Sequence, residues 1–186
     1  MSSQKEIILK PIGVIRTTAF GDEVRDKTRT SQIVIRNDLT EALDGIDGFS
    51  HLFVLFLLHE IPNRHKKILK VHPRGRKDMP LLGVFATRTM FRPNPVGLTL
   101  VKLLKVEANV LTVRGLDAFE GTPVLDIKSF DSWDNAKTAR VPEWWKHLEK
   151  EEIQKTRNNC FTAFLKTIFC CYCFKYVRPE HLSLES

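Results

Sequence analysis

Apolar and polar residues alternate over several short stretches of the chain, a pattern typical of β-strands with one covered face. Residues 31–37 (SQIVIRN) alternate in this way, and residues 7–17 (IILKPIGVIRT) are rich in β-branched residues. Residues 49–59 (FSHLFVLFLLH) are apolar at almost every position, which predicts a central strand covered on both faces. Similar patterns predict further strands at 81–88, 96–107, 110–118 and 123–130.

The number and spacing of these strands predict the fold class. Residues 96–107 and 110–118 flank a two-residue turn and are expected to form a hairpin, with Gly115 as a bulge. Because many short strands accompany few helices, we expect a mainly β protein. It should be a small closed antiparallel β-barrel with a few short helices and a C-terminal helical extension.

Two helices are expected between and after the strands. Asp38 and Glu41 have the spacing of a capping box and predict a short helix over 38–45. Pro142, at a first-turn position, predicts a second helix that continues to about residue 155. The sequence thus predicts a barrel domain over 1–145 and a helical extension with a tail over 146–186.

Cysteine and apolar content indicate the compartment. All four cysteines lie in the tail, so the barrel is expected to fold without disulfides, and a reducing cytoplasm is the expected location. The longest uninterrupted apolar run, Leu52 to Leu58, has seven residues, against the ~20 needed to cross a bilayer, so no membrane partner is expected. The tail is expected to pack on the barrel or on a neighbouring subunit; an interfacial helix and a poorly ordered end are the alternatives.

Positive charge is concentrated in one segment. The whole chain carries +7, whereas residues 64–92 alone hold nine basic residues against one acidic residue, Asp78, and so carry +8. A basic stripe on a nearly neutral body favours a polyanionic partner such as nucleic acid; a solvated loop is an equally weighted alternative. The residues expected to contact RNA are Arg64, Lys66, Lys67, Arg74, Arg76 and Lys77.

Several common sites are absent from the sequence. No G-x-G-x-x-G follows a predicted strand and no P-loop is present, which argues against a Rossmann or P-loop nucleotide site. His59-Glu60 begins like a zinc-protease motif, but the next histidine is His65, and Pro62 prevents a helix that presents both. No metal site is expected.

Residues 83–99 (GVFATRTMFRPNPVGLT) suggest a preorganised site. Pro93 and Pro95 hold the preceding residues, Arg92 and Asn94, in extended conformations, and Gly97 lets the chain pass close to a neighbouring group. Two polar side chains on a stiff loop are suited to a small ligand, although a rigid barrel corner would look the same. Arg88 follows a predicted apolar strand, so a half-buried guanidinium with an anionic partner is expected there.

Residues 120–130 (EGTPVLDIKSF) provide a second candidate. The turn Gly121-Thr122-Pro123 is expected to leave backbone N–H groups for a ligand. Asp126 and Lys128 fall on one face of the following strand, as a coupled acid and base would. An ion pair on a solvated face is the alternative interpretation.

Together these segments resemble one family. IGVIRT (12–17), FSHLFVLFLLH (49–59), GVFATRTMFRPNPVGLT (83–99) and GTPVLDIK (121–128) resemble the TrmO/TsaA-like family in sequence and order. The resemblance implies a β-barrel methyltransferase that uses S-adenosylmethionine without a Rossmann fold. It also implies methylation of N6 of threonylcarbamoyladenosine, beside the anticodon of threonine tRNA, by a homodimer.

The resemblance also implies roles for individual residues. The family's cofactor contacts fall on His59, Glu60, Arg88, Leu98, Glu120, Gly121, Thr122 and Pro123. For the transfer we expect Asp126 to accept the N6 proton, Lys128 or Arg92 to stabilise negative charge, and Asn94 to orient the base. Glu120 stands where the family usually has Asp, and the basic segment is expected to replace a C-terminal tRNA-binding domain. The alternatives are a same-fold methyltransferase for another RNA or small molecule, and a non-catalytic binding module.

Overall fold

The computed structural model describes residues 7–136 and 138–151. The chain divides into two compact units, Met1–Lys137 and Thr138–Ser186, so the expected boundary after residue 145 falls inside the second unit. In that unit a helix begins at residue 143, one residue after Pro142, and is described as far as residue 151. The rest of the expected helix and the cysteine-containing tail lie outside the described residues.

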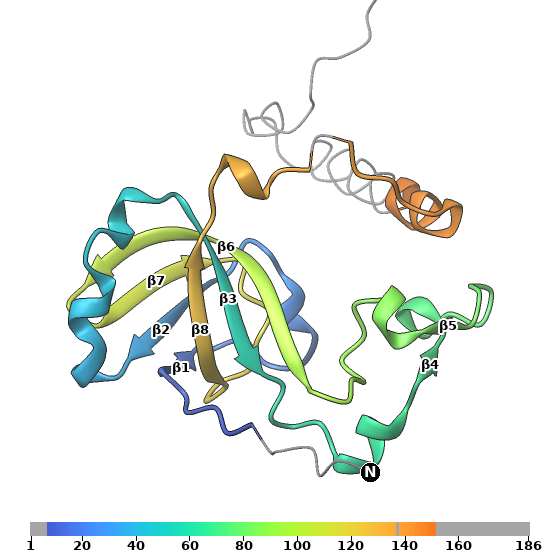
Figure 1. Ribbon diagram of the computed structural model, residues 1–186, viewed down its shortest axis with the longest axis horizontal. Helices are drawn as coiled ribbons and strands as arrows, with labels where there is room; N and C mark the ends of the chain where they lie inside the picture. Colours follow the sequence, from blue (N-terminus) through green and yellow to red (C-terminus); the bar gives the residue numbers. More distant parts are fainter. Residues whose placement is uncertain (1–6, 137, 152–186) are drawn as a thin grey trace, which may run out of the picture. The chain divides into compact units, whose positions relative to one another are not determined.

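The first unit is a closed barrel of six antiparallel strands (Figure 1). The barrel strands are β1 (Gly13–Arg16), β2 (Thr30–Ile35), β3 (His51–Leu57), β6 (Val96–Glu107), β7 (Val110–Arg114) and β8 (Pro123–Ser129). They pair in the order β1-β2-β7-β6-β3-β8, and β8 returns to β1. The predicted mainly β, closed antiparallel barrel is therefore confirmed.

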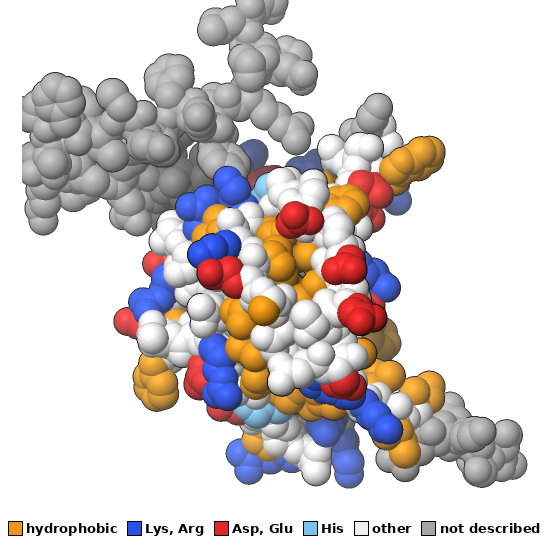
Figure 2. Space-filling model, turned by 90° about the vertical axis from the view of Figure 1, so that its left-hand side faces the viewer, with side chains coloured by type: hydrophobic (Ala, Val, Ile, Leu, Met, Phe, Trp, Pro, Cys, Tyr) orange, Lys and Arg blue, Asp and Glu red, His pale blue; other side chains and the backbone are white. Residues whose placement is uncertain are grey.

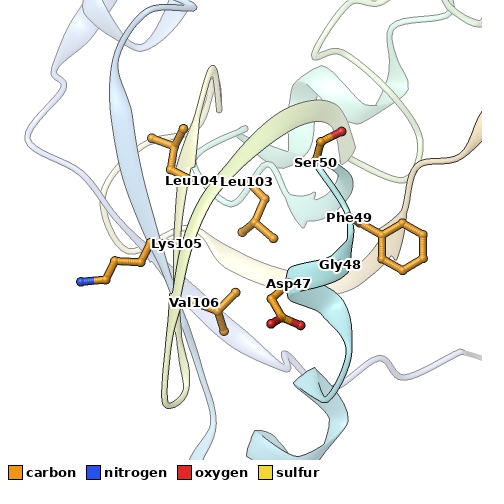
Figure 3. A pocket seen from close by; sticks show the side chains of 8 residues that line it. All are labelled: Asp47, Gly48, Phe49, Ser50, Leu103, Leu104, Lys105 and Val106. Atoms are coloured by element: carbon orange, nitrogen blue, oxygen red, sulfur yellow. The ribbon is translucent and has the colours of Figure 1, made fainter.

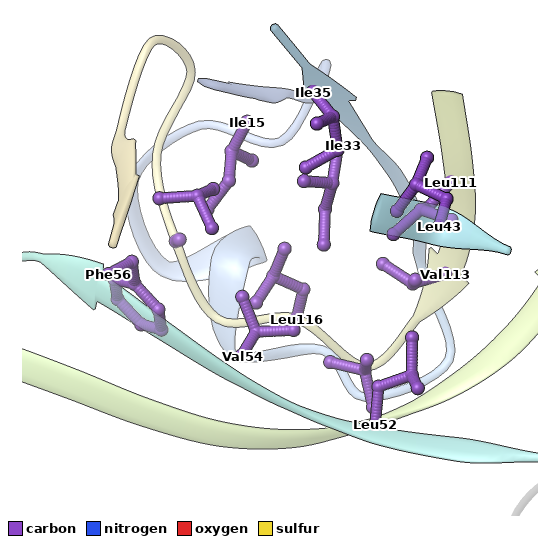
Figure 4. Close-up of a cluster of buried hydrophobic side chains, with 13 residues drawn as sticks. Ile15, Ile33, Ile35, Leu43, Leu52, Val54, Phe56, Leu111, Val113 and Leu116 are labelled. Carbon is purple, nitrogen blue, oxygen red and sulfur yellow. The ribbon is translucent and has the colours of Figure 1, made fainter. Parts of the chain in front are cut away.

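The barrel interior is filled by alternate residues of the strands. In β3, Leu52, Val54 and Phe56 are buried and point into the core drawn in Figure 4. The residues between them, such as Phe53 and Leu55, are half-buried on the outer face. The expectation that both faces of this strand are fully covered was therefore wrong for the outer face.

Two predicted strands are much shorter than their apolar patterns. Only Gly13–Arg16 of residues 7–17 forms a strand, because pairing with β2 begins at Gly13 opposite Ile35. Only Leu82–Gly83 of residues 81–88 forms a strand, β5, because its partner β4 (Lys70–Val71) is equally short. A 3₁₀ turn, η6 (Val84–Ala86), follows β5 directly.

Short 3₁₀ turns connect most strands. They are η1 (Gly21–Arg25), η2 (Asn37–Leu43), η3 (Ile46–Gly48), η4 (Asn63–Lys67), η5 (Pro73–Gly75), η6 and η7 (Ser132–Asp134). The predicted helix over 38–45 is η2, but its capping box does not form, because Asp38 pairs with Arg36. The bulge expected at Gly115 is also absent: β7 ends at Arg114, and the register shift lies between Leu103 and Lys105 of β6.

Candidate functional site

Three segments meet at the C-terminal end of β3. The backbone N–H of Leu58, just after β3, donates to the carbonyl of Pro95 at 2.7 Å. The next residue, His59, has its Nδ1 atom 3.4 Å from the Thr122 hydroxyl. The segments that precede β6 and β8 therefore both contact the chain as it leaves β3. We call residues 58–60, 92–95 and 120–123 the β3 rim.

Gly97 explains how the proline-containing corner fits against β3. A Cβ at Gly97 would lie 2.4 Å from Cε2 and 2.5 Å from Cζ of the Phe56 ring. Gly97 pairs directly with Phe56 across β6 and β3. The close neighbour expected at this glycine is therefore the core ring of Phe56.

The turn before β8 does not present the free backbone donors that were expected. Gly121 has a φ of 74°, which glycine adopts without strain, and its N–H donates to the Ile15 carbonyl at 2.9 Å. The N–H of Thr122 donates to the Phe119 carbonyl at 3.3 Å, and its carbonyl accepts from Ile15 at 2.9 Å. Pro123 has no N–H. The expectation of free N–H groups at Gly121 and Thr122 was therefore wrong.

Glu120 joins this turn to the end of β1. One carboxylate oxygen accepts from Arg16 at 2.8 Å, and the other accepts from the backbone N–H of Thr17 at 2.6 Å. The hydrogen bond from Arg16 lowers the pKa of the Glu120 carboxyl, so the group stays ionised. Glu120 also lines a polar hollow of about 500 Å³, together with Arg16, Thr17, Thr18, Thr30, Ser31, Gln32 and Thr112.

Asp126 and Lys128 lie on the outer face of β8 and form an ion pair. Lys128 Nζ is 2.8 Å from Asp126 Oδ2, and the other carboxylate oxygen accepts from the Ile127 N–H at 2.9 Å. The hydrogen bond to Asp126 raises the pKa of Lys128, which therefore keeps its charge at neutral pH. Both oxygens of Asp126 are held, so the carboxylate has a fixed orientation.

Strand pairing brings Leu98 near this ion pair. Leu55 of β3 pairs with Leu98 on one side and with Asp126 on the other. Leu98 and Asp126 are thus separated by two strand spacings, about 10 Å, on the same outer face. This face adjoins the β3 rim, where His59 Nε2 also lies 3.9 Å from Glu60 Oε1.

The arginines before β6 have different environments. Arg92 donates to the carbonyls of Val84 at 3.3 Å and Thr87 at 3.0 Å. Arg88 is exposed and makes no hydrogen bond or ion pair within the described residues. The expectation of a half-buried Arg88 with an anionic partner was wrong, because η6 replaces the apolar strand that would have covered it. Asn94 is also exposed, and its carbonyl accepts from the Val96 N–H at 2.8 Å.

The six basic residues expected to contact RNA all lie in the connection between β3 and β6. Within it, His72 Nδ1 is 2.7 Å from the Met79 carbonyl, a contact that closes the loop carrying Arg74, Arg76 and Lys77. Arg76 Nε donates to Asp78 at 3.1 Å. In contrast, the barrel face drawn in Figure 2 carries both acidic and basic side chains between apolar ones. A large excess of positive over negative charge is thus a feature of this connection.

Other parts of the described structure offer less chemistry. A hollow of about 300 Å³ is lined by the residues drawn in Figure 3, and its polar side chains include Asp47 and Ser50. It lies by the start of β3, at the opposite end of that strand from the rim. Among residues 7–136 and 138–151, no three His, Cys, Asp or Glu side chains converge on a possible metal site. No helix in these residues is long and apolar enough to span a membrane.

Sequence reasoning missed the contacts that hold the loop between β1 and β2. Asp117 accepts from the Thr99 hydroxyl and lies 3.3 Å from Lys27 Nζ, which also donates to the Gly115 carbonyl at 3.0 Å. These partners are up to 90 residues apart in the chain, so no local spacing links them. The charge complementarity of Lys27 and Asp117 was the only signal in the sequence.

The barrel and its rim match a known family. The family described as tRNA-methyltransferase O N-terminal domain matches residues 22–134, which include β2 to β8 and all three rim segments. The chain belongs to this family. The TrmO/TsaA-like resemblance of the sequence is thereby confirmed.

Relatives in this family differ in length. A probable S-adenosyl-L-methionine-binding protein of Methanothermobacter thermautotrophicus is 42% identical over 133 residues, covering 69% of this chain and 93% of that protein. The human tRNA (adenine(37)-N6)-methyltransferase is 44% identical over 138 residues, covering 73% of this chain and 30% of the human protein. The crystal structure of TrmO from Pseudomonas aeruginosa aligns with a TM-score of 0.61 and 29% identity. That alignment covers 77% of this chain and 63% of the TrmO chain, a little under two thirds.

Proposed function

We propose that this chain transfers the methyl group of S-adenosylmethionine to N6 of adenine 37 in a tRNA. The names of the mammalian relatives support the reaction, and those of the archaeal relatives support the cofactor. The observation that carries the proposal is the β3 rim. Residues that the family resemblance assigns to the cofactor, from chain segments about 60 residues apart, come into contact there through His59 and Thr122.

The rim side chains fit the chemistry of this cofactor. S-adenosylmethionine supplies an electrophilic methyl group on a positively charged sulfur. The exposed carboxylate of Glu60 suits a sulfonium, and the exposed guanidinium of Arg88 suits the methionine carboxylate. Because the backbone donors of Gly121 and Thr122 are already used and Thr122 is only 2% exposed, recognition at this turn falls to the exposed side chain of His59, which contacts Thr122.

Asp126 is the proposed proton acceptor. With S-adenosylmethionine bound, the Asp126 carboxylate would accept the N6 proton as the methyl group passes to N6 and the sulfur keeps the electron pair of the broken carbon–sulfur bond. Lys128 holds that carboxylate at 2.8 Å and supplies a positive charge beside it. Asn94 is proposed to orient the base edge, and Arg92 is the alternative to Lys128 for stabilising developing negative charge.

The finer substrate is proposed from the resemblance. We infer that the adenine carries a threonylcarbamoyl group, that the tRNA is threonine tRNA, and that the reaction takes place in the cytoplasm. A carbamoylated N6 is a urea nitrogen whose lone pair is delocalised, so removal of its proton is the step that needs help. Asp126, which lies 2.8 Å from Lys128, is proposed to provide that help.

A homodimer is also proposed. Leu98 and Leu100, 57% and 43% exposed, form an apolar strip with Phe53 and Leu55 on the outer face of β6 and β3. The resemblance implies a homodimer, and we propose that a second copy of the chain covers this strip. Sedimentation of the protein should then give twice the chain mass, and Leu98→Lys should give the monomer mass.

The function is tested by methyl transfer. The purified chain is incubated with S-adenosylmethionine labelled in the methyl group and with tRNA carrying threonylcarbamoyladenosine, and nucleosides are analysed by mass spectrometry. We expect label on N6 of that nucleoside. Asp126→Asn should abolish turnover while leaving cofactor affinity by calorimetry nearly unchanged, whereas Arg88→Ala should weaken cofactor binding. Asp44→Asn, at an exposed carboxylate in a turn, is the matched control.

A binding module without catalysis is the second candidate. Three archaeal relatives, of which the chain covers 89–93%, are named as S-adenosyl-L-methionine-binding proteins, two of them as probable ones, which favours this alternative. Cofactor binding without transfer to any tRNA nucleoside would support it. Transfer to a different nucleoside would retain the enzyme but overturn the threonylcarbamoyl substrate.

A further inference from the structure

Phe85 is an exposed aromatic residue whose ring contacts an arginine. Its side chain is 77% exposed, although it directly follows the buried Val84 in η6. The guanidinium carbon of Arg92 is 5.7 Å from the centroid of its ring. The same arginine binds the carbonyls of Val84 and Thr87, on either side of Phe85 in the chain. One ring face is thus backed by a cation while the residue remains largely open to solvent.

The surroundings of Phe85 are positively charged. η6 is joined to the strand pair β4–β5, because the N–H of Val84 donates to the Leu69 carbonyl at 3.0 Å. Lys70 of β4 pairs with Gly83, two residues before Phe85. Lys66, Lys67, Lys70, Lys77 and Arg88 make no ion pair within the described part of the chain. An exposed ring in a chain segment rich in unpaired cations suits a ligand with both flat faces and negative charge.

We propose that the Phe85 ring is a stacking platform for an unstacked base in the anticodon loop of the RNA. The inference rests on the proposed function and names how its substrate is held. Single-stranded nucleic acids are bound by aromatic side chains that stack on bases and by cations that contact phosphates. An enzyme that modifies a base must also draw it out of its stack, and a ring that stacks the base offsets that cost.

A contact between two copies of this chain is the competing explanation for an exposed Phe85. In a two-fold dimer the same surface would meet itself. Such a contact through Phe85 would bring two copies of the segment 64–92, each with a charge of +8, close together. Charge repulsion therefore favours RNA over a second copy at this position.

The test is a titration of the full chain with a fluorescently labelled anticodon stem-loop of threonine tRNA, in the presence of S-adenosylhomocysteine. Phe85→Ala should weaken RNA binding by about fivefold or more, since stacking on one aromatic side chain is worth that much. Phe85→Trp, which keeps a stacking ring, should bind like the wild type. Phe20→Ala, at a phenylalanine 84% exposed beside η1, is the matched control and should bind normally.

Two further readouts separate stacking from other roles. The slope of log affinity against log salt should be the same for Phe85→Ala and wild type, because the variant keeps every cation that can bind a phosphate. Cofactor affinity by calorimetry should also be unchanged.

Equal RNA affinity of Phe85→Ala and wild type would overturn the stacking role and leave the proposed function intact. A Phe85→Ala protein with reduced dimer mass and normal RNA affinity would assign Phe85 to a subunit contact instead. A wild-type chain that binds no tRNA would overturn both proposals.

Discussion

Replacing Gly97 by alanine should destabilise the barrel through its contact with Phe56. The added Cβ would lie 2.4 and 2.5 Å from two carbons of the Phe56 ring, whereas carbon atoms normally pack at about 3.5–4.0 Å. The ring must therefore move by about 1 Å or more. Phe56 is only 2% exposed and is packed inside the barrel, so it has little space to move.

The expected cost follows from two opposing effects. Overpacking a core costs about 1–3 kcal/mol, and a displacement this large belongs at the upper end. Alanine gains about 0.5–1 kcal/mol over glycine in a strand. The net loss at Gly97 should therefore be about 2 kcal/mol, or about 4–8 °C in Tm for a chain of this length.

Urea and thermal unfolding of the wild type, Gly97→Ala, Phe56→Leu and the double variant would test this reasoning. Phe56→Leu removes the two ring carbons nearest to Gly97, so Gly97→Ala should cost much less in that background than in the wild type. Gly83→Ala is the matched control, since a Cβ there would meet nothing within 4 Å. An equal cost of Gly97→Ala in both backgrounds, or no cost in the wild type, would show that the Phe56 ring is not the cause.

Three other changes test the turn, the acid behaviour and the charge of the chain. Gly121→Ala, at a φ of 74°, should lower the free energy of unfolding by about 1–2 kcal/mol in urea titrations. Because the pKa of Glu120 is lowered on folding, its contribution is present above the ordinary value of 4.5 and disappears as pH falls through the lowered pKa. Glu120→Gln should accordingly be less stable than wild type at pH 7 and equally stable in strong acid. Replacing Lys66 and Lys67 by alanine should reduce the salt slope of RNA binding by about 0.7 for each phosphate that the variant no longer neutralises.

The barrel was predictable because burial determines the alternation of its strands. Residues 31–37 and 110–118 show one covered face in the sequence, and both form barrel strands, over Thr30–Ile35 and Val110–Arg114. Strand length was less predictable, because it depends on a partner. Residues 81–88 are as apolar as a barrel strand but lie opposite β4, which has only two residues.

The sequence indicated which chain segments form the site, but it did not indicate which residues in them bond to distant parts of the chain. The spacing of Asp126 and Lys128 implied a shared face, and they form an ion pair. Nothing local in the sequence indicated that Glu120 is bound by Arg16, which is 104 residues away. The use of the Gly121 N–H by Ile15 was equally hidden, because it follows from the closure of the barrel between β8 and β1.

These contacts determine how the β3 rim can recognise a ligand. Barrel closure uses the backbone donor of Gly121, the turn itself uses that of Thr122, and Glu120 uses both of its oxygens on Arg16 and Thr17. The groups left for binding are side chains that project from the ends of strands, such as His59. A site of this kind can change its ligand by substitution without loss of the barrel, because the bonds that close the barrel are different ones. Substitutions at His59 should therefore alter binding, whereas those at Gly97 and Gly121 should act mainly on stability.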